Sequence, residues 1–330
     1  GHEASVQLWW QQLTQKLGWQ GGEIEKSWQT QRTLSNVCLN PSAPLRAAHH
    51  IKLSADDCVF SPGDLVEVMP EVDEFDLKTK ISEQGWFSEE VVNFQQQSVS
   101  LIDALKQLDW QKEFAESPQL LIDKLPALIP RTYSIASCRA QQSIDLLVRK
   151  VIKEDESIGL CSGYLANIKE SQSVKVSIKQ HEKFHAPAAD TPIIMIAAGT
   201  GLAPFIGFLE QRQRQPSYGK AWLIMGERDE KVDNYLSEKL DKFEQKGCLH
   251  KRQHAWSQSS GSLNQKYVGD ILFSEQVQIR DWLFNFNAHL YICGNAATLG
   301  TSCNKVLEDI LGEEKLTSLR KQNKIKYDLY

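Results

Sequence analysis

The stretch TPIIMIAAGTGLAPF, residues 191–205, decides the fold of the C-terminal half. Its first part, Pro192–Ala197, is a continuous apolar run, which is typical of a strand buried on both faces. The Gly199–Gly201 turn follows, and Ala203-Pro204 then begins a helix, because proline is favoured in a first helical turn. The stretch therefore predicts a strand, a tight turn and a helix in succession.

The same alternation of strand and helix continues through the rest of the chain. Further strands are expected at Ala221–Met225, His250–Trp256 and Ala288–Cys293. This pattern predicts a parallel, doubly wound α/β sheet over residues 188–330. Ligands of such sheets bind at the carboxyl ends of the strands. We therefore expect a dinucleotide across the segments that follow those ends, which are Gly199–Gly201, Gly226–Arg228, Ser257-Gln258 and Cys293–Asn295.

Residues 25–187 show a different pattern, in which short strands are separated by Gly/Pro turns. Strands are expected at His50–Leu53, Leu65–Val68, Arg131–Ser137 and Ile144–Ile152. Such spacing predicts a β-sandwich or a β-barrel. Residues 72–128 interrupt the pattern with an acidic, Gln-rich and helical stretch, for which we expect a helical insertion.

Within residues 1–24, residues 4–17 have the apolar spacing of an amphipathic helix, which Gly18 and the Gly21-Gly22 pair end. This helix is expected to be either the last helix of a preceding domain or one that packs on the domain that follows. The chain opens with Gly1-His2 in place of an initiator Met, so we expect it to be part of a longer protein.

The Pro130–Ser137 stretch brings three different functional groups into one expected strand. Arg131 offers a bidentate cation, Tyr133 an aromatic plane and Ser134 a short hydroxyl. Together these groups could hold a flavin nucleotide. The alternative is an edge strand with a surface arginine.

The Gly159–Gly163 stretch is a second candidate site, because two glycines flank a Cys-Ser pair before an apolar run. A loop of free backbone N–H groups that opens a short helix binds anions and suits a pyrophosphate. The alternative is a turn with a helix cap at Ser162.

The composition of the 330-residue chain is that of a soluble globular protein of about two domains, with 41% hydrophobic and 24% charged residues. A net charge of −5 argues against a general nucleic-acid binder. No apolar run reaches the roughly 18 residues of a membrane span, and no signal peptide is visible. The seven cysteines show no metal-binding or disulfide spacing. We therefore expect a cytoplasmic protein, or the cytoplasmic part of a larger membrane-attached one.

Four motifs stand in order along the chain, namely RTYS at 131–134, GLCS at 159–162, AAGTGLAPF at 197–205 and CGN at 293–295. With these motifs, and with Asp-Leu-Tyr at 328–330, the chain resembles the diflavin reductases, the family of the sulfite reductase flavoproteins and cytochrome P450 reductases. The resemblance covers residues from about 30 to 330 and corresponds to the half that is similar to ferredoxin-NADP reductases. It implies a β-barrel FAD-binding domain with a helical connecting insertion, followed by an NADP-binding α/β domain. The helix in residues 1–24 would then be the end of a flavodoxin-like FMN domain.

The resemblance also implies roles for individual residues. FAD would be bound by Arg131, Thr132, Tyr133 and Ser134, and its pyrophosphate by Gly159, Leu160, Cys161 and Ser162. Tyr330 would stack on the flavin and leave before the nicotinamide binds. Thr200 would contact the nicotinamide nucleotide, and the adenosine 2′-phosphate would be recognised by Arg228, Ser257, Gln258, Lys266 and Tyr267. The catalytic set around the hydride path would be Ser134, Cys293 and Asp328.

Some positions depart from the family pattern. Gln258 and Gln265 stand where arginine and lysine are usual, so we expect Arg228, Lys266 or Arg252 to compensate and NADPH to be favoured over NADH. The expected activity is an FAD-dependent NADPH reductase module that passes electrons to an FMN domain, in the same chain or separate, or to another one-electron acceptor. The alternatives are a stand-alone ferredoxin or ferric reductase and a non-catalytic docking module.

Overall fold

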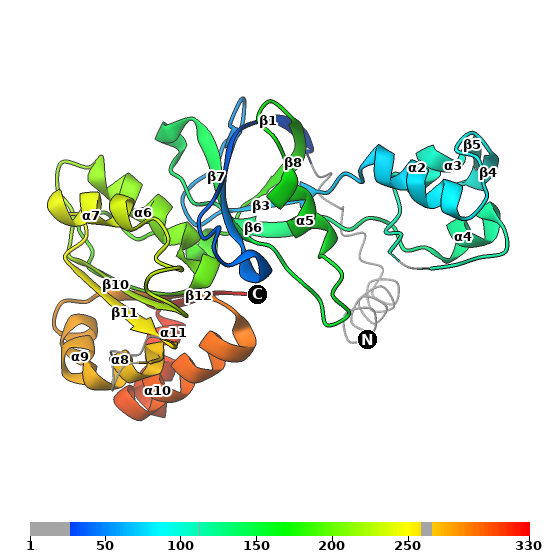
Figure 1. Ribbon diagram of the computed structural model, residues 1–330. Helices are drawn as coiled ribbons and strands as arrows, with labels where there is room; N and C mark the ends of the chain where they lie inside the picture. The colour runs from blue at the N-terminus through cyan, green and yellow to red at the C-terminus, as the bar shows by residue number, and fades with distance from the viewer. Residues whose placement is uncertain (1–26, 112, 259–265) are drawn as a thin grey trace, which may run out of the picture.

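The computed structural model of the protein describes residues 27–111, 113–258 and 266–330. The helix expected in residues 1–24, and Gln265, lie outside the described residues. Three lobes stand in a row in Figure 1, with the α/β domain at the left, an antiparallel sheet in the middle and the 72–128 insertion at the right.

The middle lobe is a six-stranded antiparallel sheet in the order β6-β3-β8-β1-β2-β7. Its strands are β1 (Gln29–Cys38), β2 (Ala48–Ser54), β3 (Leu65–Met69), β6 (Arg131–Ser134), β7 (Ser143–Arg149) and β8 (Ser173–Lys179). The two edge strands meet at a single bridge, Ile135 to Leu146, so the sheet is barrel-like without being closed. Fully buried side chains such as Val66 and Val68 fill its inside. The predicted barrel is confirmed in this form.

The insertion at residues 72–128 contains a β-hairpin as well as helices. Its helices are α2 (Glu74–Glu83), α3 (Leu101–Leu105) and α4 (Pro118–Lys124), and its hairpin strands are β4 (Val91–Phe94) and β5 (Gln97–Ser100). Leu77, Leu101 and Leu121 belong to a hydrophobic core of the insertion's own. The insertion carries the expected helices, and residues 91–100 add a hairpin that the sequence pattern did not reveal.

The C-terminal lobe is a five-stranded parallel sheet in the order β11-β10-β9-β12-β13. Its strands are β9 (Ile193–Ala198), β10 (Ala221–Glu227), β11 (Lys251–Trp256), β12 (His289–Gly294) and β13 (Ile325–Leu329). One face is covered by α6 (Ala203–Gln213) and α7 (Ser237–Gln245). The other face is covered by α8 (Val268–Ser274), α9 (Gln276–Phe284), α10 (Thr301–Leu311) and α11 (Glu313–Lys321). The predicted doubly wound sheet is confirmed, and β13 is an additional strand that the sequence pattern did not reveal.

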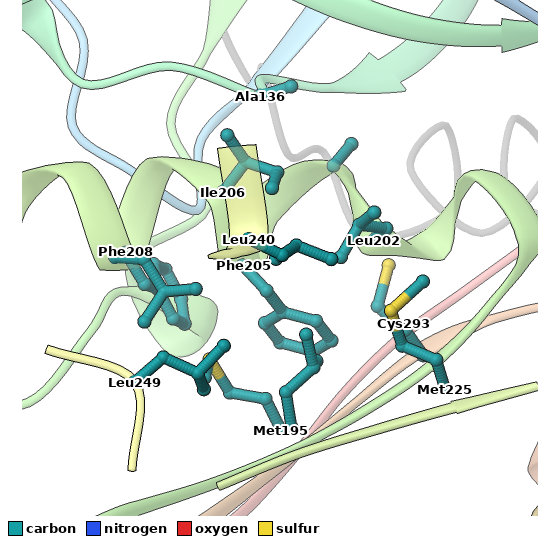
Figure 2. Close-up of a cluster of buried hydrophobic side chains, with 14 of the residues drawn as sticks. Ala136, Met195, Leu202, Phe205, Ile206, Phe208, Met225, Leu240, Leu249 and Cys293 are labelled. Carbon is teal, nitrogen blue, oxygen red and sulfur yellow. The ribbon is translucent and has the colours of Figure 1, made fainter. Parts of the chain in front are cut away.

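The middle lobe and the α/β domain share one hydrophobic core. Ala136, at the end of the barrel-like sheet, lies over α6 in Figure 2, beside Ile206 and above Phe205. Phe184, from the short helix η3 (Glu182–Phe184) that follows β8, packs edge-on against Tyr291 of β12, with ring centroids 5.3 Å apart. This shared packing fixes the end of β6 close to the carboxyl end of β12.

Candidate active site

Strand β6 presents the residues of the RTYS motif at the open edge of the barrel-like sheet. Arg131 and Thr132 are exposed, whereas Tyr133 and Ser134 are half-buried. Within the described part of the chain, the Arg131 guanidinium forms no ion pair. The motif therefore leaves a cation and an aromatic ring at the surface of this edge.

The catalytic set expected from the sequence lies together in space. Ser134 Oγ donates a hydrogen bond of 2.6 Å to Asp328 Oδ2, across 194 residues of sequence. Cys293 Sγ donates to the same carboxylate oxygen at 3.5 Å, because Cys293 and Asp328 are register partners on the neighbouring parallel strands β12 and β13. A side chain from the barrel-like sheet thus meets two from the α/β domain.

The Cys293 thiol is completely buried, and this burial decides its chemistry. Burial raises the pKa of Cys293 well above its ordinary value, and the negative charge of Asp328 raises it further. The sulfur therefore stays protonated at neutral pH and acts as a hydrogen-bond donor, since only a thiolate would act as a nucleophile.

The Gly199–Gly201 turn joins β9 to α6 and passes very close to β12. A Cβ atom on Gly201 would lie 2.1 Å from the Cys293 carbonyl oxygen, so only glycine fits. Thr200 Oγ1 lies 3.0 Å from the hydroxyl of Tyr330. Tyr330 is held from the other side by its backbone N–H, which donates to Gly294 O at 3.2 Å. As a residue Tyr330 is 60% exposed, and its phenol group lies near Cys293 and Asp328.

The GLCS motif opens helix α5 (Leu160–Asn167), with Gly159 at the N-cap and no side-chain cap. The first N–H groups of a helix have no partner within the helix and can bind an anion. Ser162 lies inside the helix, where its Oγ donates to Gly159 O at 3.0 Å and accepts from Val151 N–H at 3.1 Å. The alternative of a helix cap at Ser162 was therefore wrong.

The Cys161 side chain points into the protein, beneath β6. Burial raises the pKa of the Cys161 thiol, although Tyr133 and Arg131 oppose the rise. Burial likewise raises the pKa of Tyr133, and the neighbouring Cys161 adds to the rise. The start of α5 therefore lies against β6, the strand that carries Arg131.

The residues expected at the 2′-phosphate lie at the carboxyl ends of β10 and β11. The two ends are tied by backbone bonds from Gln258 N to Arg228 O, 2.8 Å, and from Ser257 N to Glu227 O, 2.9 Å. Arg228 and Gln258 are exposed there. The other two expected residues, Lys266 and Tyr267, are exposed at the start of α8, which packs on β10 through the contact of Val268 with Gly226.

Arg252 does not belong to this group. Its guanidinium pairs with Asp241 at 2.5 Å and with Glu244 at 3.0 Å, both on α7. The expectation that Arg252 could compensate for a missing cation was wrong, because the alternation of β11 directs residue 252 toward α7.

Two charged residues at the same edge were missed by the sequence analysis. Arg149, at the end of β7, reaches across the domain boundary and pairs with Glu227, at the end of β10. A glutamate at the end of an otherwise apolar strand was the sequence signal for this pair.

Across the described residues, no group of three His, Cys, Asp or Glu side chains is arranged to hold a metal ion. No helix in that same part of the chain is both long and apolar enough to cross a membrane.

Comparison with known proteins agrees with this architecture. The family profile of the oxidoreductase NAD-binding domain matches residues 195–305. The sulfite reductase [NADPH] flavoprotein alpha-component of Buchnera aphidicola is 34% identical over 233 residues, which cover 65% of this chain and 38% of the relative. The proteins of the same name from Mannheimia succiniciproducens and Salmonella typhimurium are 33% and 32% identical, again over 38% of each relative.

The matched chain thus spans well under half the length of these curated relatives. The family match lies on the parallel sheet, and the barrel-like sheet with its insertion precedes it in the order that the family shows. The comparisons and the fold therefore support the resemblance to the diflavin reductases, and within them to the half that is similar to ferredoxin-NADP reductases.

Proposed function

We propose that the chain is an FAD-dependent NADPH oxidoreductase module, which passes electrons from NADPH through FAD to an FMN domain or another one-electron acceptor. The observation that carries the proposal is the meeting of Ser134, Cys293 and Asp328 at the junction of the two domains. Hydride transfer requires two rings to be held in contact, and this junction is where groups from both domains converge.

The residues present suit FAD. The Arg131 guanidinium and the first amides of α5 form a set of phosphate donors, and Tyr133 provides an aromatic plane beside them. Tyr330 would cover the other face of the flavin. When bound, FAD supplies the hydride acceptor and the outlet for single electrons.

Asp328 would act through its charge. The hydrogen bonds from Ser134 and Cys293 fix its carboxylate at the junction, so its position does not have to change during the reaction. A nicotinamide ring becomes cationic as hydride leaves, and a fixed carboxylate nearby stabilises that charge. Thr200 would contact the nucleotide once Tyr330 has moved away.

NADPH is proposed over NADH because Arg228 and Lys266 are exposed at the expected 2′-phosphate position, with Ser257 and Tyr267 beside them. Gln258 supplies a neutral donor there. Discrimination between the two nucleotides then depends on Arg228 and Lys266.

The partners and the location follow from the same proposal. An FMN domain, in the same chain or separate, would receive electrons from FAD and pass them to a downstream acceptor. All seven cysteines are free thiols and six of them are buried, which supports a cytoplasmic protein.

The test is spectroscopic. The purified protein, loaded with FAD, should lose its flavin absorption when NADPH is added without oxygen, and should do so more slowly with NADH. Arg131→Ala should be purified with much less FAD, whereas Arg139→Ala, which changes another exposed arginine of the same lobe, should keep it. Failure of the wild-type protein to bind FAD would refute the proposal and favour the non-catalytic docking module.

A further inference from the structure

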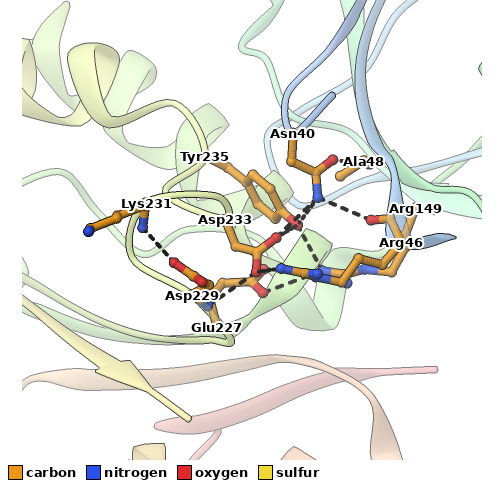
Figure 3. A network of polar contacts seen from close by, with 9 residues as sticks. All are labelled: Asn40, Arg46, Ala48, Arg149, Glu227, Asp229, Lys231, Asp233 and Tyr235. Carbon is orange, nitrogen blue, oxygen red and sulfur yellow. Dashed lines mark hydrogen bonds and ion pairs between the residues drawn. The ribbon is translucent and has the colours of Figure 1, made fainter. Parts of the chain in front are cut away.

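The junction holds a second polar cluster, which the proposed hydride path does not use (Figure 3). Arg149 Nη2 donates to Glu227 Oε1 at 3.2 Å and to the Tyr235 hydroxyl at 3.1 Å. The Glu227 side chain is only 3% exposed, whereas the Arg149 side chain is 29% exposed. The guanidinium thus has a buried partner on one side and an open face on the other.

The second acid of the cluster, Asp233, is held in a different way. Its side chain is completely buried, with Arg46 Nη2 2.8 Å from Oδ2 and Asn40 Nδ2 3.0 Å from Oδ1. Burial alone would raise the pKa of Asp233, but the hydrogen bonds from Arg46 and Asn40 outweigh it and lower the pKa. Asp233 is therefore an anion at neutral pH.

Glu227 has the opposite electrostatic behaviour. Burial raises the pKa of Glu227 to about 7, with Arg149 opposing the rise and Asp233 adding to it. The ionisable groups that act on the Glu227–Arg149 pair are Asp233, Tyr235 and Tyr330, and the backbone of Arg228 also bonds Glu227. Arg46 and Asp229 act on Asp233. Among the acids of this cluster, Glu227 is the one poised to exchange a proton near neutral pH.

The Glu227–Arg149 pair lies directly against the Gly199–Gly201 turn, which is called the nucleotide turn from here on. Gly199, the first residue of that turn, has a positive φ of 60°. A Cβ atom there would lie 3.1 Å from Arg149 Nη2 and 3.4 Å from Glu227 Oε1. The turn follows the carboxyl end of β9, the edge at which doubly wound sheets bind their ligands, and continues through the short 3-10 helix Gly199–Leu202 into α6.

We propose that Glu227 is a proton-linked gate on dinucleotide binding. Binding of an anionic nucleotide at the Gly199–Gly201 turn favours transfer of a proton from solvent to the Glu227 carboxylate. Glu227 is then neutral, so the positive charge of Arg149 is free to attract the nucleotide. This inference rests on the proposed function, because it concerns the same nucleotide.

The physical reason is reciprocal linkage. A carboxylate beside the turn repels a phosphate and competes with it for Arg149, so the nucleotide binds more tightly to the protonated form. By the same coupling, the bound nucleotide favours protonation of Glu227. Proton uptake and pH-dependent affinity are therefore two measures of one effect.

The test is isothermal titration calorimetry of NADP⁺ with the FAD-loaded wild-type protein, at about pH 7.5 in buffers of different ionisation enthalpy. We expect uptake of about half a proton or more per nucleotide, and a Kd that rises by up to about tenfold per pH unit above neutrality. Glu227→Gln should bind NADP⁺ more tightly than the wild type at about pH 8.5, by about tenfold or more, and should take up almost no proton. Because the 2′-phosphate itself titrates near pH 6, the difference between the two proteins is the readout.

Glu210→Gln is the matched control. Glu210 is also 3% exposed and paired with a cation, Lys239 at 2.7 Å, but it lies farther along α6 and hydrogen-bonds to Cys138. The control should keep the proton uptake of the wild type. If Glu227→Gln does not fold, the proton count of the wild-type protein with NAD⁺, which has no 2′-phosphate to titrate, decides the inference.

The outcomes are distinguishable. Tight binding of NADP⁺ without proton uptake, or a Glu227→Gln protein with the pH dependence of the wild type, would overturn the gate and leave the proposed function standing. A wild-type protein that neither binds NADP⁺ nor is reduced by NADPH would overturn the proposed function, and the gate with it.

Discussion

Removal of the Ser134 hydroxyl group should separate the effect of the junction on the rate of hydride transfer from its effect on stability. Ser134→Ala deletes the 2.6 Å hydrogen bond to Asp328 and leaves the carboxylate free to turn toward solvent. Hydrogen bonds to charged groups contribute about 1.5–3 kcal/mol, and because both residues are half-buried we expect about 1–2 kcal/mol here. If that energy is needed to hold Asp328 in place, hydride transfer should slow by about 5- to 30-fold.

The assay is the rate of flavin reduction by NADPH, measured by anaerobic stopped flow, together with urea unfolding of the same preparations. The chain offers a closely matched control, because Ser100 Oγ also donates to an aspartate, Asp103, at 2.6 Å. Ser100 caps α3 in the insertion, so Ser100→Ala should cost about 1 kcal/mol of stability and leave the reduction rate unchanged. A Ser134→Ala protein that is reduced as fast as the wild type would refute the role of the hydrogen bond.

Three further predictions concern the surroundings of the junction. Gly201→Ala should lower the free energy of unfolding by several kcal/mol in urea titrations, because its Cβ would overlap the Cys293 carbonyl oxygen; a fully stable variant would contradict this. Tyr330→Phe removes the hydroxyl that is hydrogen-bonded to Thr200 in the Gly199–Gly201 turn. Because the ring has to move away before the nucleotide binds, the variant should bind NADP⁺ about three- to tenfold more tightly, as measured by calorimetry. An unchanged Kd would show that this hydrogen bond does not hold the ring in place. Arg46→Ala should cost about 3–5 kcal/mol at neutral pH, since it leaves Asp233 buried without its cation. Because the folded pKa of Asp233 is depressed, that contribution should be present above the ordinary value of 3.8 and lost as the pH falls further, so the difference between the two proteins in urea titrations should shrink as the pH falls below 3.8.

The parallel sheet could be predicted because its signals are local. Pro192–Ala197 is apolar without interruption, and Gly201 of the next turn is required by the close approach to β12. The barrel-like sheet was also predictable, because its short strands alternate between turns.

The hairpin of the insertion escaped prediction because its turn lacks the usual residues. Gln95 and Gln96 both have positive φ, 51° and 65°, where hairpins normally carry asparagine or glycine. A glutamine pair therefore gave no turn signal, and the Gln-rich composition suggested helix. Side chains that meet only in three dimensions were also invisible, as with Arg149 and Glu227, which are 78 residues apart.

Strand β13 escaped for another reason. Only Ile325 among its five residues is buried, and Lys326 and Asp328 give it the composition of a surface segment. Its place in the sheet depends on pairing with β12, which no local pattern encodes. The resemblance to the family was needed to single out Asp328.

The hydrophobic core that joins the barrel-like sheet to the α/β domain has a mechanical consequence. Relative rotation of two domains is the ordinary expectation when their interface is small and polar, but here Phe184 and Ala136 pack within the same core as α6 and β12. A hinge at this boundary would have to break that packing, so the two lobes should move as one rigid body. If electrons leave the flavin for a partner, the partner has to come to a fixed docking surface on these two lobes. The domain motion that electron transfer requires would then be that of the partner.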